Sequence, residues 1–186
     1  MPLLIDLKVA ILIENGFEQS ELASPRETLE KAGVQVEVIS PRHGEVKAWD
    51  HDTWGIRVKV DKHIADTDPR DYDGLLLPGG VLHIDELRMN PLALDFVMRF
   101  VASGKPVAAI GHAPLILINT GAIEGRQVTS CIPIHADLIN AGGLWTDREV
   151  VVDHGMITSR SFNDLDAFNK KLLEVLRAGT PEPVDN

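Results

Sequence analysis

The 186-residue chain has little cysteine, no excess of positive charge and no long hydrophobic run. Its one cysteine, Cys131, excludes an internal disulfide and favours a reducing, intracellular location. Lys and Arg number 18 against 28 Asp and Glu, and the net charge of −10 argues against nucleic acids and anionic membranes as partners. No apolar run approaches the length of a membrane span, and Met1–Lys8 lacks the basic region and cleavage site of a signal peptide. We therefore expect a soluble, cytoplasmic protein.

What the chain does contain is an alternation of strands and helices. Lys8–Ile13 is a continuous apolar run typical of a strand buried on both faces, Glu18–Ala32 reads as a helix closed by Gly33, and Val34–Ile39 forms a second strand. A β-ribbon is expected within residues 45–63. Further strands are expected at 73–80, 106–110, 127–130 and 149–159, and further helices at 91–102, 115–118, 135–140 and 163–176. We predict an α/β fold, doubly wound, with a mostly parallel sheet sandwiched by helices and a small β-ribbon insertion, as one domain over 1–178 with a frayed tail at 179–186.

An abrupt change from strand to helix occurs around Gly111. The apolar run Val107–Ile110 is followed by Gly111-His112-Ala-Pro114 and then by Leu115–Ile118, which opens a helix. This layout is typical of a nucleophile elbow, in which one side chain is exposed at the top of a sheet. A histidine follows the turn directly, but no Ser, Cys or Thr stands at the turn. The sequence predicts an enzyme-like scaffold without its attacking atom.

Several motifs converge at the carboxyl ends of the predicted strands, where doubly wound sheets place their sites. They resemble the ThiJ/PfpI family, and more specifically its PfpI-type branch of intracellular proteases and glyoxalase- or deglycase-like enzymes. The resemblance implies a flavodoxin-like, class I glutamine amidotransferase-like fold, and it extends in order from about Lys8 to Leu176. The motifs are Gly16-Phe-Glu18-Gln-Ser-Glu21-Leu, Leu77-Pro-Gly-Gly80, Ala109-Ile-Gly-His-Ala-Pro114, Gly125-Arg-Gln-Val-Thr-Ser130, Asn140-Ala-Gly-Gly and Ser159-Arg160.

The family resemblance implies a cysteine at the elbow, a histidine directly after it, a glutamate from the first loop that contacts the thiol, and an acidic residue from a neighbouring subunit that orients the histidine. On this sequence, Glu18 matches the glutamate, His112 the histidine and Asp85 the acidic position, while Gly111 occupies the place of the cysteine. The helix dipole also favours a glutamate at a helix start, so Glu18 has a purely structural interpretation as well. Its register with the family motif favours the functional one.

The segment Val81–Arg88 is expected at the surface, yet Leu82, Ile84 and Leu87 within it are apolar. Apolar residues of this kind are typical of an interface rather than of a free loop. Together with the cross-subunit role that the resemblance implies for Asp85, they predict a homodimer or a higher homo-oligomer.

Gly111 fits the backbone of an elbow. Elbow residues are often held at positive φ, where a side chain costs about 1–3 kcal/mol, whereas glycine adopts such angles freely. We expect Gly111 at positive φ, its amide and that of His112 facing an open pocket, and the Glu18 carboxyl close by. Glycine supplies no thiolate, so it excludes nucleophilic catalysis at this position. A natural member that has lost the thiol and a deliberately inactivated variant both fit this pattern.

Other residues near the expected site have two interpretations each. Cys131, in Thr129-Ser130-Cys131-Ile-Pro, is a relocated nucleophile or a small buried hydrophobe, and we favour the second because no base adjoins it in sequence. Arg160 is a surface ion-pair partner or an anion clamp. Gly79 and Gly80 are expected to bind the ligand.

The seven histidines show no helical i, i+4 ligand spacing, and no cysteine cluster accompanies them, so we expect no metal and no cofactor. The family resemblance places His83 and His135 near the mouth of the pocket, and most of the others are expected at the surface or in loops. The seven are His43, His51, His63, His83, His112, His135 and His154.

Three hypotheses about function follow. The first is a Cys-dependent hydrolase or glyoxalase-like enzyme for small carbonyl or peptide-like substrates, in which the nucleophile is replaced. The second is a non-catalytic member that binds a small carboxylate or carbonyl ligand, for stress response or regulation. The third, ranked lowest, is a hydratase-like activity in which Glu18 alone acts as acid and base. Phe17, Trp49 and Leu82 are expected to line the pocket.

Overall fold

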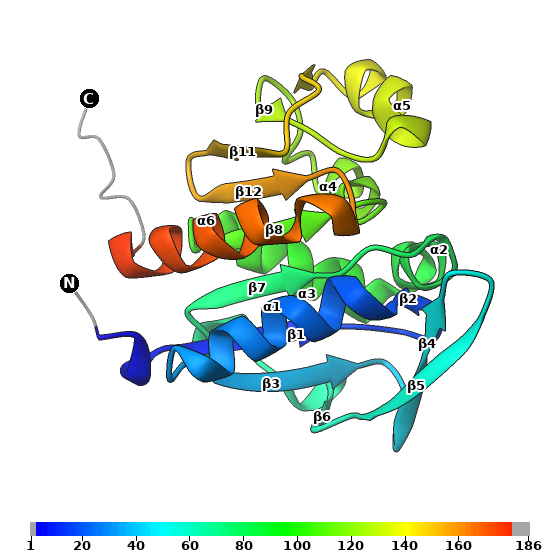
Figure 1. Ribbon diagram of the computed structural model, residues 1–186, viewed down its shortest axis with the longest axis vertical. Helices are drawn as coiled ribbons and strands as arrows, with labels where there is room; N and C mark the ends of the chain where they lie inside the picture. Colours follow the sequence, from blue (N-terminus) through cyan, green and yellow to red (C-terminus); the bar gives the residue numbers. More distant parts are fainter. Residues whose placement is uncertain (1–2, 180–186) are drawn as a thin grey trace.

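The computed structural model describes residues 3–179, and its centre is a seven-stranded, mostly parallel sheet (Figure 1). The strand order is β11-β12-β8-β7-β1-β3-β6, in which only β11 is antiparallel to its neighbour. This is the doubly wound fold that the sequence predicted. The strands are β1 (Lys8–Leu12), β3 (Gln35–Ser40), β6 (Lys62–His63), β7 (Gly74–Leu77), β8 (Val107–Ile110), β11 (Val150–Asp153) and β12 (Met156–Ser159).

Helices cover both faces of the sheet, because its central strands are apolar on both sides. One face carries α1 (Gln19–Lys31) and α6 (Leu165–Ala178), which lie in front of the sheet in Figure 1. The other carries α2 (Val81–Met89), α3 (Pro91–Ala102), α4 (Pro114–Asn119) and α5 (His135–Asn140). Short 3₁₀ turns complete the connections: η1 (Leu4–Asp6), η2 (Ile64–Asp66), η3 (Pro69–Asp71), η4 (Ile132–Ile134) and η5 (Phe162–Asp164).

Two small sheets lie beside the main one. The predicted ribbon is the antiparallel pair β4 (Glu45–Asp50) and β5 (Thr53–Lys59), and β2 (Phe17–Glu18) joins β4 in parallel. The second small sheet pairs β9 (Gln127–Val128) with β10 (Leu144–Trp145). Because β2 connects the end of β1 to the ribbon, it brings the ribbon to the carboxyl edge of the main sheet.

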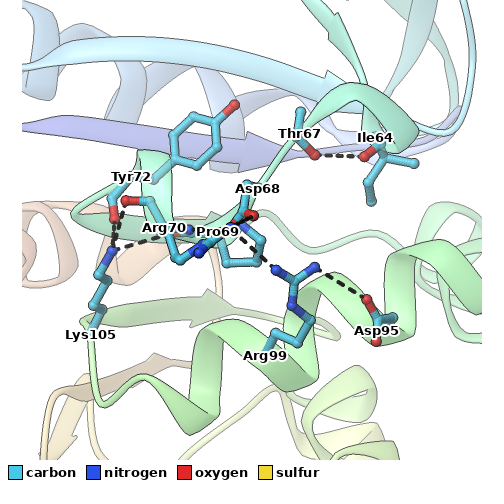
Figure 2. A network of polar contacts seen from close by, with 9 residues as sticks. All are labelled: Ile64, Thr67, Asp68, Pro69, Arg70, Tyr72, Asp95, Arg99 and Lys105. Atoms are coloured by element: carbon cyan, nitrogen blue, oxygen red, sulfur yellow. Dashed lines mark hydrogen bonds and ion pairs between the residues drawn. The ribbon is translucent and has the colours of Figure 1, made fainter.

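A polar network fixes the opposite, amino-terminal edge (Figure 2). The Lys105 ammonium, just before β8, donates to the Tyr72 carbonyl at 2.6 Å and to the Pro69 and Arg70 carbonyls at 3.3 Å each. Arg99 of α3 pairs with Asp68 in the same loop. These contacts tie the loop before β7 to the start of β8, and so they align the two strands whose carboxyl ends form the site.

The segment 81–88 differs from the expected surface loop. It is helix α2, and Ile84 and Leu87 are fully buried in the core of their own chain, while Val81 and Leu82 remain about half exposed. The apolar residues here are therefore explained mostly by core packing, not by an interface. Of the expected tail, residues 180–186 lie outside the described part of the chain. Between residues 3 and 179, none of the helices has the length and apolar character that a bilayer crossing requires.

Candidate functional site

The elbow has the predicted backbone geometry. Gly111 follows β8 at a φ of +65°, which confirms the expected positive φ, and α4 begins three residues later. Its amide does not face a pocket as expected, because it donates to the Ser159 carbonyl at 3.1 Å. This bond continues the parallel pairing of β8 with β12 by one step beyond Ile110. The elbow is thus held by the sheet itself, whatever side chain it carries.

The carboxylate beside the elbow is that of Glu21, where the sequence predicted Glu18. A Cβ built on Gly111 would lie 2.9 and 3.1 Å from the two Glu21 carboxyl oxygens, which are its nearest heavy atoms. The difference follows from where helix α1 begins. Glu18 caps the helix, whereas Glu21 lies in the first turn on the buried face that includes Pro25 and Leu29. The i, i+4, i+8 spacing of these three residues was the sequence signal for an inward-facing glutamate.

Burial controls the protonation of Glu21. The residue is 4% exposed and receives one backbone hydrogen bond, from the Gly79 amide at 2.9 Å. Burial, with a contribution from the Glu18 charge, raises the pKa of Glu21 to about 8, although the Gly79 amide opposes the shift. At neutral pH the side chain is therefore mostly an uncharged acid that can donate a hydrogen bond.

The glycine turn after β7 makes room for these groups. A Cβ on Gly79 would lie 2.0 Å from a Glu21 carboxyl oxygen, and one on Gly80 would lie 2.4 Å from the Gly16 carbonyl oxygen. Neither position can accept a side chain without displacing its neighbours. Gly79, a predicted ligand-binding residue, contacts Glu21, while Gly80 lines the adjoining cavity.

A cavity of about 470 Å³ opens in front of the elbow. It contains the predicted site residues Glu18, His112 and Gly80 and the predicted wall residues Trp49 and Leu82. Phe17, the third predicted wall residue, is instead fully buried in the core. His51 is exposed, as expected, but it also lines the cavity, which the sequence interpretation missed. Its place beside Trp49 in the ribbon was the available signal. The lining residues are Gly16, Glu18, Trp49, His51, Gly80, Val81, Leu82 and His112.

His112 and Asp85 influence each other within one chain. Burial lowers the pKa of His112, and the charge of Asp85 partly opposes this shift. Asp85 is largely exposed on α2 and also lies 3.8 Å from the Arg88 guanidinium. The role of Asp85 toward the His112 of a neighbouring subunit stays a prediction.

Cys131 and Arg160 lie on the other side of the elbow, around a second cavity of about 430 Å³. The Cys131 amide donates to the Gly111 carbonyl at 3.2 Å, and burial together with the Glu21 charge raises the pKa of its thiol to about 12. Such a thiol is a poor nucleophile, which favours the inert interpretation. The Arg160 guanidinium donates to Asp164 and Asp147 at 2.8–2.9 Å, so it is an ion-pair partner rather than a free anion clamp.

The remaining histidines lie away from the cavity. His83 was expected near its mouth but is fully buried, where its Nε2 contacts the Pro78 carbonyl at 2.7 Å and burial lowers its pKa to about 4. His135 contacts the Ile132 carbonyl through Nδ1, and the His43 ring stacks on that of His63. Within residues 3–179, no three His, Cys, Asp or Glu side chains are arranged to hold a metal ion.

Comparison with known proteins decides the family. The model of the DJ-1/PfpI family matches residues 7–175. The chain belongs to the DJ-1/PfpI family. It is 43% identical over 173 residues to protein/nucleic acid deglycase 2 of Escherichia coli, covering 92% of this chain and 98% of that protein. It is 38% identical over 171 residues to deglycase PfpI of Pyrococcus furiosus, covering 92% of this chain and all of that protein.

A solved structure shares the fold closely. A two-domain protein of Anabaena variabilis that contains DJ-1/ThiJ/PfpI-like and ferritin-like domains superposes with a TM-score of 0.87 and 33% identity, over 97% of this chain and 50% of that one. The family that the sequence motifs resembled is thus confirmed. Within this family, the present chain has glycine at the strand-to-helix turn where the sequence analysis expected a nucleophile.

Proposed function

We propose that this protein is a DJ-1/PfpI member that binds a small carbonyl or carboxylate compound at the elbow and performs no thiol chemistry there. The observation that carries the proposal is the intact elbow: Gly111 keeps the positive φ beside an open cavity, and the Glu21 acid lies against it. Two relatives are named deglycases, one of them a protein/nucleic acid deglycase, and glycation is the addition of a carbonyl compound to an amine, so these names support a carbonyl ligand.

Glu21 supplies the contact that such a ligand needs. Its carboxyl oxygens lie 2.9 and 3.1 Å from the position that a Cβ on Gly111 would take. A ligand atom cannot occupy that position, which is one bond length from the Gly111 Cα, but the short distances show that the Glu21 acid faces the elbow, where its proton can be donated to a ligand oxygen that approaches beside Gly111. The neighbouring apolar walls, Trp49 and Leu82, fit a compact ligand with few polar groups.

The first hypothesis, a Cys-dependent enzyme whose nucleophile is replaced in this chain, can be tested by restoring a thiol on the same scaffold. A Gly111→Cys substitution places the new side chain against Glu21, whose proton can stabilise a thiolate. We further propose a cytoplasmic protein, which the single cysteine supports, that is a homo-oligomer, which the predicted role of Asp85 supports, and that has a role in stress response.

The experiment has two parts. The chain as it stands should not turn over methylglyoxal by a thiol-dependent route, whereas Gly111→Cys in a Cys131→Ser background should be alkylated by iodoacetamide near neutral pH faster than free cysteine. Pyruvamide, a small uncharged α-oxo compound, should shift the amide resonances of Gly16 and His112 in a heteronuclear NMR titration.

Two results would contradict the proposal. If the present chain turns over methylglyoxal and Cys131→Ser abolishes the activity, the nucleophile has relocated to Cys131. If pyruvamide at millimolar concentration leaves the cavity resonances unchanged while amides elsewhere respond, the cavity is not a site for small carbonyl compounds.

A further inference from the structure

Two histidines of this chain, His51 and His154, have a left-handed backbone, with φ of +58° and +47°. Each follows an aspartate and contacts it through Nδ1, at 2.8 Å for His51 and Asp50. Histidine and aspartate are common at such turns, so the local conformation alone has no functional meaning. Their locations differ, however. His154 is at the turn from β11 to β12, at the amino-terminal edge of the sheet, whereas His51 lines the cavity at the elbow.

The ribbon tip that carries His51 is fixed from several sides. The Trp49 indole donates to the His51 carbonyl at 2.8 Å, and the Gln19 amide group donates to Asp50 at 3.2 Å. Gln19 also accepts the Ile56 amide at 2.8 Å, so α1 holds both strands of the ribbon. Asp50 therefore links the helix to the His51 ring, and it leaves Nε2 as the ring nitrogen available to a ligand.

We propose that His51 is a ligand-binding residue of the elbow cavity, and that its protonated ring pairs with the carboxylate of a small α-oxo acid. The inference rests on the proposed function and narrows its ligand class from carbonyl or carboxylate compounds to anions. The ribbon tip places the His51 ring in the lining of the cavity, next to the elbow residue His112. Asp50 is a positioning residue, which acts through His51.

The charges around the cavity support an anionic ligand. The hydrogen bond that the His51 ring donates to Asp50 and the charge of Asp50 raise the pKa of His51, and the charges of Glu18 and Asp52 add to this effect. Burial raises the pKa of Glu18, against the charge of His51. The pKa of Glu21 is also raised, and burial lowers the pKa of His112. A falling pH therefore shifts both acids toward their neutral forms and His51 toward its charged form, and both changes favour a bound carboxylate.

Pyruvate and pyruvamide test this proposal, because they have the same size and differ in the charge of one group. Binding of each should be followed by NMR at pH 6 and pH 8.5 with the full chain, with His51→Asn and with the matched His154→Asn. Asparagine is neutral and tolerates left-handed backbone, so both variants are expected to fold. Because a charge-assisted hydrogen bond is lost, we expect His51→Asn to weaken pyruvate binding at pH 6 about tenfold or more.

The expected pattern has three further parts. Pyruvate should bind more weakly at pH 8.5 than at pH 6 in the unmodified chain and in His154→Asn. In His51→Asn binding should be weak at pH 6 and change less with pH, because only the loss of the Glu21 proton then contributes. Asp50→Asn should move the midpoint of this pH dependence to lower pH, because the ring loses the carboxylate that favours its charge. Pyruvamide binding should be unaffected by His51→Asn.

Other outcomes distinguish a failure of the role of His51 from a failure of the proposed function. If pyruvamide binds but pyruvate does not, or if His51→Asn leaves pyruvate binding and its pH dependence unchanged, the role of His51 is refuted and the carbonyl-binding function stands. If neither compound perturbs the Gly16 and His112 resonances at either pH, both the proposed function and this inference are refuted.

Discussion

The pH dependence of stability should depend strongly on one buried carboxyl group, that of Glu21. In the folded protein its pKa is about 8, against 4.5 for the unperturbed group. Below pH 4.5 the group is protonated in both states, and unfolding releases no proton. Between pH 4.5 and 8 the unfolded chain is ionised while the folded protein keeps the proton, so unfolding releases one proton and becomes easier as the pH rises. Glu21 therefore stabilises the fold at low pH, and this contribution is lost on approach to pH 8.

The magnitude follows from the size of the shift. One pKa unit corresponds to about 1.4 kcal/mol, so the contribution changes by about 5 kcal/mol across the whole window. This is a large share of the roughly 5–15 kcal/mol by which domains of this kind are stable. His83 acts in the opposite direction: its buried ring has a pKa lowered to about 4, so its contribution is lost as the pH falls from 6.5 to 4. The pH dependence of the total free energy of unfolding therefore contains contributions from both Glu21 and His83.

Glu21→Gln isolates the effect, because glutamine has the same shape and stays uncharged at every pH. Urea unfolding of the unmodified chain and of Glu21→Gln should be compared at several pH values from 4.5 to 8.5, since the difference between the two curves cancels His83. The unmodified chain should lose stability relative to the variant as the pH rises. Glu45→Gln, at an exposed position of β4, serves as the control and should leave the curve unchanged. A pH-independent difference between the unmodified chain and Glu21→Gln would refute the buried, protonated state of Glu21.

Three further predictions concern the elbow, the ribbon and the assembly. Gly111→Ala should lower the free energy of unfolding, measured in urea, by about 1–3 kcal/mol. The loss should exceed that of the control Gly125→Ala, because Gly125 also has a positive φ but no atom lies within 4 Å of its added Cβ. Equal losses would mean that the Glu21 carboxyl group beside the elbow adds no strain. Gln19→Ala should increase hydrogen exchange of the Ile56 amide, its partner at 2.8 Å, and unchanged protection would show that the helix does not hold the ribbon. Light scattering at micromolar concentration should show at least a dimer, and a monomer would remove the cross-subunit role of Asp85.

The elements that the sequence predicted best are those whose local signals agree with their packing. Helix α3 has the predicted bounds, since Asn90 accepts the Leu92 and Ala93 amides and Pro91 occupies the first turn. Strand β8 was predicted because it is apolar throughout and buried on both faces. Helix α2 was missed because it follows the glycine turn without a side-chain cap, and its buried residues resembled an exposed apolar loop.

The site was predicted less fully, because proximity across the chain is not a local property. Gly111 and His112 are adjacent in sequence, so their placement followed from one strand-to-helix turn. The choice between Glu18 and Glu21 depended on where α1 begins, because Glu18 is the N-cap with an extended backbone, whereas Glu21 lies within the helix on its buried face. His51 reaches the cavity only because the ribbon pairs with β2, a contact between segments about thirty residues apart.

The chemistry of the elbow changes when glycine stands at the position of the nucleophile. Where a thiolate is present, a protonated acid beside it donates its hydrogen bond to the sulfur. Without one, the proton of Glu21 is available to a ligand oxygen, and the His51 ring of the ribbon lines the adjoining cavity. A ligand that accepts a hydrogen bond from Glu21 favours its protonated form, and a ligand carboxylate favours the protonated form of His51. Both contacts therefore favour the same low-pH state, so the two groups should reinforce each other in binding an anion and weaken together as the pH rises.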